Sequence, residues 1–269
     1  MEQAVSAMIR NRDREQGPLR VLDLGSPKLF GFYLARHYDV DLLMTDISPL
    51  NIDPGLKMWA PLRPRARGRA RFEIRDARCL SDSGGTYDIV YAMSVLEHVE
   101  GDGGDAAAVG EMLRVLKPGG LLMFSVPFGP LFREQMIRGV AHSVQRTRRD
   151  NLFFFQRIYD RTRVENRLLR PLRGRIDREN IWTIDRRPSR LLQSYHALRG
   201  SLPESVMTAL GFLNPIMSAA LNRHRPGVVE PEATTYGTLH HFGDIYGDLI
   251  FIAHKKVETS IAPNTRTPS

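Results

Sequence analysis

The stretch VLDLGSPKLFGFYLAR, Val21–Arg36, is the strongest indication of architecture in this sequence of 269 residues. A short apolar run ends at Gly25, and apolar residues then recur at helical spacing from Leu29 to Tyr38. This pattern predicts a buried strand that leads directly into a helix. Because Gly25 has no Cβ, its backbone can approach a ligand at the end of the strand.

The same alternation continues through the first half of the chain. A helix is predicted over about Asp105–Leu116, ending at the turn-forming KPGG of Lys117–Gly120. Further strands are predicted at Val40–Thr45, Ala70–Ile74, Tyr87–Met93 and Leu121–Pro127. Strands separated by helix-length segments need crossover connections. We therefore expect an α/β fold with a doubly wound, mostly parallel sheet and helices on both faces.

The second half of the chain is less regular. A helix is predicted over Thr162–Leu169, and strands are predicted at Glu179–Asp185 and within Asp244–Lys256. The resulting organisation has four parts: a helical lead in residues 1–18, the sheet domain in residues 19–188 and 239–257, a helical insertion or lid before the last strand in residues 189–238, and a disordered tail in residues 258–269.

Composition narrows the class of protein. The chain is 42% hydrophobic and 25% charged, as is ordinary for a soluble globular protein. Its single cysteine, Cys79, excludes an internal disulfide framework and a cysteine-based zinc cluster, so we expect a cytoplasmic protein. The polar N-terminus does not resemble a secretory signal. The longest apolar stretch, Val206–Leu221, falls short of the roughly 20 residues that span a bilayer.

Four features fall at the ends of predicted strands, where an open parallel sheet binds its ligands. Gly25 follows the first strand, and Asp46, 21 residues later, follows the second at the spacing of a ribose-binding carboxylate. Asp76 follows the third strand, where it could accept a hydrogen bond from the adenine amine. Met93 and Ser94 follow the fourth, where an apolar side chain could cover the base. Each acid alone could be an ordinary turn residue, but their order indicates a nucleoside site.

The residues in this order, DLG, a strand-ending Asp, RDA, YDIVYAMSVLEHV and RVLKPGGLLMFSVP, resemble the class I S-adenosylmethionine-dependent methyltransferases. More narrowly, they resemble the type-11 group of small-molecule methyltransferases. The resemblance covers about Leu19 to Phe128. Its most specific motifs are LEHV (Leu96–Val99) and LRVLKPGG (Leu113–Gly120). It implies a Rossmann-like fold and S-adenosylmethionine as the cofactor.

The resemblance also implies which residues hold each part of the cofactor. Asp23, Gly25 and Ser26 would contact the methionine end, and Asp46 and Ile47 would contact the ribose. Asp76 and Ala77 would hold the adenine, and Met93 and Ser94 would lie beside the sulfonium. The family usually carries further glycines in the first loop, where this chain has Ser26-Pro27-Lys28. S-adenosylmethionine has no pyrophosphate for the loop to wrap, and Pro27 can serve as the first helical residue.

The methyl group of this cofactor lies on a positively charged sulfur, so the main tasks are in-line positioning and exclusion of water. A general base helps only a weak nucleophile such as a hydroxyl, and histidine is the natural candidate. His98 follows the fourth strand, His240 and His241 precede the last one, and His142 is a further candidate. His98 could equally cap or pack within its own helix. We expect no metal site, because nothing completes a ligand set around the paired histidines.

The predicted acceptor is an oxygen or nitrogen of a small molecule, such as a glycan, lipid or secondary-metabolite intermediate. Phe153, Phe154, Phe155 and Tyr159 could form an aromatic wall for it, or could simply pack one side of an amphipathic helix. The arginine-rich region Arg133–Arg190 could bind an anionic acceptor, although its interleaved acids favour a solvated surface.

Three alternative functions remain open. The net charge of +8 keeps an RNA methyltransferase as an alternative, with nucleic acid less favoured than a small molecule. A second alternative is a non-catalytic binding protein of the same fold, because Ser26-Pro27 departs from the usual glycine pattern of the first loop. A nicotinamide-dependent dehydrogenase is disfavoured by the missing second and third glycines.

Overall fold

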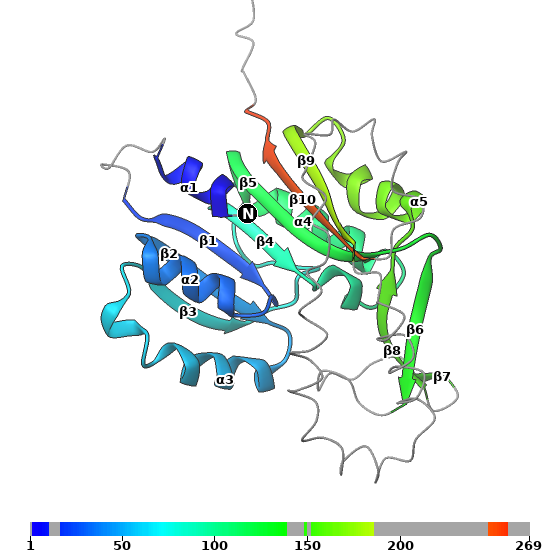
Figure 1. Ribbon diagram of the computed structural model, residues 1–269, viewed down its shortest axis with the longest axis horizontal. Helices are drawn as coiled ribbons and strands as arrows, with labels where there is room; N and C mark the ends of the chain where they lie inside the picture. The colour runs from blue at the N-terminus through cyan, green and yellow to red at the C-terminus, as the bar shows by residue number, and fades with distance from the viewer. Residues whose placement is uncertain (1, 11–16, 139–147, 150–151, 186–246, 258–269) are drawn as a thin grey trace, which may run out of the picture.

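The computed structural model describes residues 2–10, 17–138, 148–149, 152–185 and 247–257. Its centre is a seven-stranded sheet of order β3-β2-β1-β4-β5-β10-β9 (Figure 1). The strands are β1 (Leu19–Leu24), β2 (Val40–Asp46), β3 (Arg69–Ile74), β4 (Tyr87–Met93), β5 (Leu116–Phe128), β9 (Ile176–Asp185) and β10 (Gly247–Lys255). The first five run parallel, whereas β10 pairs antiparallel with both β5 and β9.

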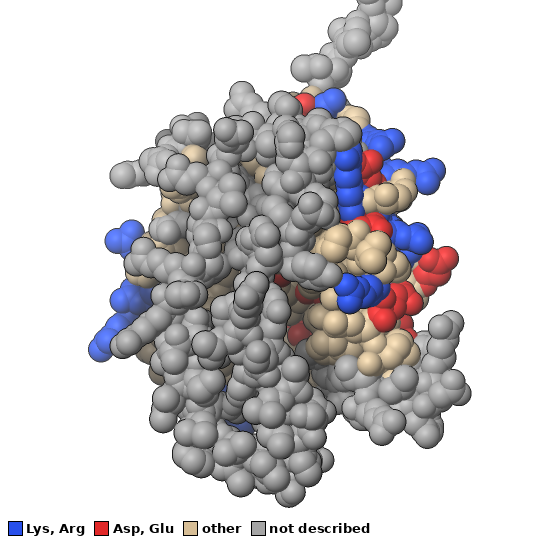
Figure 2. All heavy atoms as spheres, turned by 45° about the vertical axis from the view of Figure 1, so that its right-hand side comes forward, with Lys and Arg blue, Asp and Glu red and all other residues tan. Residues whose placement is uncertain are grey.

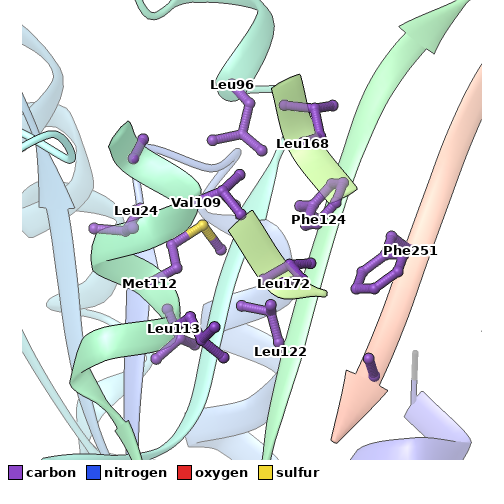
Figure 3. Packing of buried hydrophobic residues seen from close by; sticks show 14 of the residues in the cluster. Leu24, Leu96, Val109, Met112, Leu113, Leu122, Phe124, Leu168, Leu172 and Phe251 are labelled. Carbon is purple, nitrogen blue, oxygen red and sulfur yellow. The ribbon is translucent and has the colours of Figure 1, made fainter. Parts of the chain in front are cut away.

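Helices cover both faces of this sheet. The longer ones are α1 (Glu2–Arg10), α2 (Leu29–His37), α3 (Pro49–Trp59) and α4 (Gly104–Val115). Shorter turns are η2 (Arg63–Arg65), η3 (Leu96–His98), α5 (Arg161–Arg163), η4 (Val164–Leu169) and η5 (Arg170–Leu172). Val5 of α1, Phe32 of α2 and Trp59 of α3 belong to one buried cluster. The other cluster lies on the opposite face, where Val109 and Met112 of α4 meet residues of η4 and η5 (Figure 3).

The predicted doubly wound, mostly parallel sheet is therefore confirmed, and the differences are local. β5 begins at Leu116 rather than Leu121, because α4 ends at Val115 and Leu116 pairs with Tyr87 of β4. The helix expected over Thr162–Leu169 is a single α-helical turn, α5, followed by the π-helical segment η4. The insertion or lid predicted in residues 189–238 and the tail predicted in residues 258–269 lie outside the described residues.

A second, three-stranded antiparallel sheet has the order β6-β8-β7 and was not predicted. It consists of β6 (Arg133–Arg138), β7 (Arg148–Arg149) and β8 (Leu152–Ile158). The aromatic run Phe153–Phe155 thus lies on a strand and not on a helix, and Phe154 is buried beneath the guanidinium of Arg157. Tyr159 is completely buried and belongs to the core rather than to an acceptor wall. No helix among the described residues is long and apolar enough to cross a membrane.

Candidate functional site

The carboxyl ends of the first four strands surround one cavity of about 460 Å³. It opens where the strand order reverses between β1 and β4, the place at which doubly wound sheets bind ligands. Eight residues singled out in the sequence line it: Gly25, Ser26, Asp46, Ile47, Asp76, Ala77, Ser94 and His98. Asp23 and Met93 belong to the same strand ends but lie outside the lining, and His142, His240 and His241 lie outside the described residues.

The loop after β1 needs its glycine. Gly25 has a φ of 65°, and a Cβ built on it would lie 3.2 Å from Cγ1 of Val95 on the opposite wall. Its amide donates to the main-chain oxygen of Thr45 at the end of β2 (2.9 Å). The hydroxyl of Ser26 accepts from the amide of Met93 (2.7 Å), so the loop is fastened to the end of β4. The missing second glycine therefore does not leave the loop unsupported.

Asp23 lies beneath this loop and is completely buried. Its Oδ1 accepts from the amide of Ser26 (3.0 Å), which closes the turn, while its Oδ2 has no hydrogen-bond partner within the described residues. Burial raises the pKa of Asp23 to about 6, against the opposing effect of the nearby Lys28 ammonium. The carboxyl group thus shapes the loop from behind and does not reach the cavity itself.

Asp46 ends β2 with its side chain on the cavity wall, only 9% exposed. Its Oδ1 accepts from the amide of Ser48 (2.9 Å), and its Oδ2 makes no hydrogen bond with any described residue. Ser48 in turn caps α3, since its hydroxyl accepts from the amide of Leu50 and Pro49 occupies the first helical position. The strand end, the turn and the helix therefore hold one carboxylate oxygen available to a ligand.

Asp76 is held by a residue that the sequence reading overlooked. The main-chain amide and Nε of Arg78 donate to its Oδ1 (2.9 and 3.0 Å), and Nη2 of Arg78 donates to its Oδ2 (2.6 Å). These side-chain hydrogen bonds hold the pKa of Asp76 below its ordinary value, so the carboxylate stays ionised. Arg78 itself lines the cavity. Its position two residues after Asp76 was the only signal in the sequence.

The wall after β4 contains the histidine predicted there. Ser94 has a φ of 53°, a conformation uncommon for any residue except glycine, and its amide is held by the hydroxyl of Ser125 (3.1 Å). In η3, Nδ1 of His98 lies 2.7 Å from the main-chain oxygen of Phe155. A carbonyl oxygen only accepts, so Nδ1 carries the proton and the neutral ring has its lone pair on Nε2. This hydrogen bond therefore fixes the orientation of the His98 ring beside the cavity.

Charges near the site are largely paired within the protein. Arg75, which lines the cavity, donates to Glu73 (2.9 Å) and to the carboxylate of Asp82. On the surface shown in Figure 2, the basic side chains on the right-hand side alternate with acidic ones. In the region Arg133–Arg190, Arg161 pairs with Glu165 and Arg167 with Asp102. Within the described residues, no group of three or more potential ligands could hold a metal ion.

Comparisons with known proteins agree with this geometry. Residues 21–120 match a family model described as a methyltransferase domain. A S-adenosylmethionine-dependent methyltransferase from Methanosarcina mazei is 16% identical, with 93% of this chain and 98% of that one covered and a TM-score of 0.54. The [4+2]-cyclase SpnF is 20% identical, with 94% and 80% covered and a TM-score of 0.52.

A third similar structure carries ligands. It is phosphoethanolamine N-methyltransferase 2 of Haemonchus contortus with phosphomonomethylethanolamine and S-adenosylhomocysteine, 13% identical, with 95% of this chain and 52% of that one covered and a TM-score of 0.51. None of the curated proteins searched matches this sequence. At these identities the structural likeness shows the fold. The matched family model is a general one, so the narrower type-11 resemblance stays a prediction.

Proposed function

We propose that this chain is a class I S-adenosylmethionine-dependent methyltransferase that transfers a methyl group to an oxygen or nitrogen of a small molecule; the matched methyltransferase domain and the fold support this. The observation that carries the proposal is the shared cavity at the ends of β1 to β4. Gly25, Asp46, Asp76 and Ser94 come from four different strand ends and line that single space. The matched residues 21–120 include all four strand ends.

The residues of the cavity fit such a cofactor. The available Oδ2 of Asp46 suits the ribose hydroxyls, and the ionised Asp76 suits the adenine amine, beside the backbone of Ala77. Because Gly25 has no Cβ, the space beside Val95 that this atom would occupy stays open at the edge of the cavity. When bound, the cofactor supplies a methyl group on an electron-poor sulfur. The tasks left to the protein are to orient the two reactants and to exclude water.

His98 is the proposed general base for a hydroxyl acceptor. Its proton on Nδ1 is engaged by Phe155, so Nε2 is the atom that would receive the acceptor's proton as the new bond to carbon forms. His98 is about one-fifth exposed and lines the cavity, which allows an acceptor to approach it. The roles predicted for His240 and His241 stay predictions.

A small acceptor is favoured over RNA. An RNA substrate needs cationic side chains that are available to phosphates near the reaction centre. Among the described residues of the cavity lining, Arg75 and Arg78 are each hydrogen-bonded to carboxylates, and the one other permanent cation, Lys28, is only 11% exposed, too little for a phosphate backbone. The arginines at residues 63, 65, 67 and 69 are exposed, but they lie before and at the start of β3, at the opposite end of the strand from the cavity.

Binding and turnover together test the proposal. Isothermal titration calorimetry of the whole chain with S-adenosylhomocysteine should give a dissociation constant within the usual range for enzyme ligands, about 1 μM to 1 mM. Radiolabelled methyl transfer to a panel of hydroxyl and amine acceptors then identifies the substrate class. Absence of binding at millimolar ligand would favour a non-catalytic protein of this fold. Binding without transfer to any acceptor would favour another chemistry, since one similar structure is named a cyclase.

A further inference from the structure

Three described residues with permanent positive charge line the cavity, and they differ in what neutralises them. Arg75 is hydrogen-bonded to Glu73 and Asp82, and Arg78 is hydrogen-bonded to Asp76. No carboxylate of the described residues lies within hydrogen-bond distance of Lys28: its Nζ is 3.9 Å from Oδ2 of Asp23. Lys28 is therefore the cation of this lining that retains capacity for an anion.

The Lys28 ammonium is held in place without being saturated. Its Nζ donates to the main-chain oxygen of Thr45 (3.0 Å), and its side chain is only 11% exposed. An ammonium group carries three N–H donors, and the hydrogen bond to Thr45 uses one of them. The Asp23 carboxylate lies beneath it, and its Oδ2 accepts no hydrogen bond from any described residue.

We propose that Lys28 binds the carboxylate at the amino-acid end of the cofactor. This assignment rests on the proposed function, because it takes S-adenosylmethionine as the ligand. Its carboxylate is the only anionic group of that molecule, and Lys28 lines the cavity beside Gly25, Ser26 and Pro27 of the same loop. Hydrogen bonds between an ammonium and a carboxylate are about twice as strong as neutral ones, and more so away from water. Lys28 thereby selects ligands that keep the amino-acid carboxylate.

The test compares two ligands that differ only in that group: S-adenosylhomocysteine and its decarboxylated analogue, both measured by calorimetry. Lys28→Met should lower the affinity for S-adenosylhomocysteine about tenfold to a hundredfold, the range for a hydrogen bond to a charged group. The affinity for the decarboxylated analogue should change by less than about threefold. Lys57→Met, on the exposed side of α3, is the matched control and should leave both affinities unchanged.

A second variant covers the case in which Lys28→Met does not fold because Asp23 loses its counter-charge. Asp23→Asn combined with Lys28→Met removes both charges and should show the same selective loss for the carboxylate ligand. An equal loss for both ligands would overturn the assignment and make Lys28 a support of the loop. Unchanged affinity for both would also overturn it. If the wild type binds neither ligand, the proposed function fails first, and the assignment fails with it.

Discussion

Nδ1 of His98 lies 2.7 Å from the main-chain oxygen of Phe155, so a side chain in the cavity wall is oriented by a strand of the second sheet. The neighbouring Arg157 of β8, 3% exposed, reinforces the connection, because its guanidinium donates to the main-chain oxygens of Val99 and Gly101. The second sheet therefore holds the segment after β4 at three points. The base proposed for catalysis depends on this contact for its tautomer.

Two substitutions of His98 separate its orientation from its chemistry. In His98→Asn the amide nitrogen can still donate to Phe155, but nothing replaces Nε2. We expect the rate with a hydroxyl acceptor to fall about 10²- to 10⁴-fold, with stability unchanged. His98→Ala also loses the hydrogen bond and should be less stable by about 1 kcal/mol. The measurements are kcat and urea unfolding. Full activity of His98→Asn with a hydroxyl acceptor would exclude His98 as the general base.

Asp46→Asn tests the ribose contact. The asparagine oxygen can still accept from the amide of Ser48, so the turn into α3 should persist. Loss of the carboxylate should weaken S-adenosylhomocysteine about tenfold or more, because hydrogen bonds to a charged group are worth about 1.5–3 kcal/mol. Asp41→Asn is the matched control, since Asp41 is on the same strand and pairs with the exposed Arg71. Equal affinity in Asp46→Asn and the control would exclude the ribose role.

Glu97 makes stability depend on pH. Burial raises the pKa of Glu97 from an ordinary value of 4.5 to about 8 in the folded protein, and the negative charge of Asp248 adds to the effect. Between pH 4.5 and about pH 8, the folded state therefore binds more protons at Glu97 than the unfolded state does. The free energy of unfolding consequently falls as the pH rises through this window and levels off above about pH 8.

Glu97→Gln removes this proton-linked loss. Its stability relative to the wild type should increase from about pH 5 to about pH 8, by at most about 1.4 kcal/mol per pH unit. Urea unfolding across this range measures the difference. Nε2 of His98 lies 3.9 Å from Oε1 of Glu97, so the same comparison in a His98→Asn background removes any influence of the imidazole on Glu97. A difference independent of pH would show that Glu97 is ionised in the fold.

Asp105 and Arg167 form a buried ion pair away from the cavity. Nε of Arg167 lies 2.8 Å from Oδ2 of Asp105, and the hydroxyl of Tyr159 donates to the same oxygen (2.7 Å). Burial alone would raise the pKa of Asp105, but the hydrogen bonds from Arg167 and Tyr159 outweigh it and hold the pKa below its ordinary value. Arg167→Met should cost about 3–5 kcal/mol, because it leaves a completely buried carboxylate unpaired.

The control for this pair is Arg71→Met, which breaks an exposed ion pair and should cost about 1 kcal/mol or less. Arg167→Met combined with Asp105→Asn should recover part of the loss, because the unpaired charge is gone. Urea unfolding measures all three variants. If the double variant is no more stable than Arg167→Met, the loss comes from packing of the arginine stem and not from the charge.

Local patterns in the sequence were enough to predict the five parallel strands, the helices α2 and α4, and four strand ends that line one cavity; α3 was not predicted. Apolar periodicity reports which side of an element is buried, and Gly25, Asp46 and Asp76 stand at the points where that periodicity stops. Because parallel strands bring their carboxyl ends to one edge of a sheet, their convergence on one cavity followed from chain order alone.

The contacts that orient the side chains could not be read in this way. Phe155 is 57 residues from His98, and Thr45 is 17 residues from Lys28; no periodicity records which distant carbonyl a side chain will meet. The second sheet was missed for a related reason: β6 is mostly polar, β7 has only two residues, and their pairing with β8 depends on a neighbour rather than on their own pattern. The sequence alone thus determined the parallel sheet and the edge at which its cavity lies, because both follow from local burial and strand order. The placement of Asp23 behind the loop, of Lys28 in the cavity and of Arg78 on Asp76 required the folded chain, because hydrogen bonds and charges act through space.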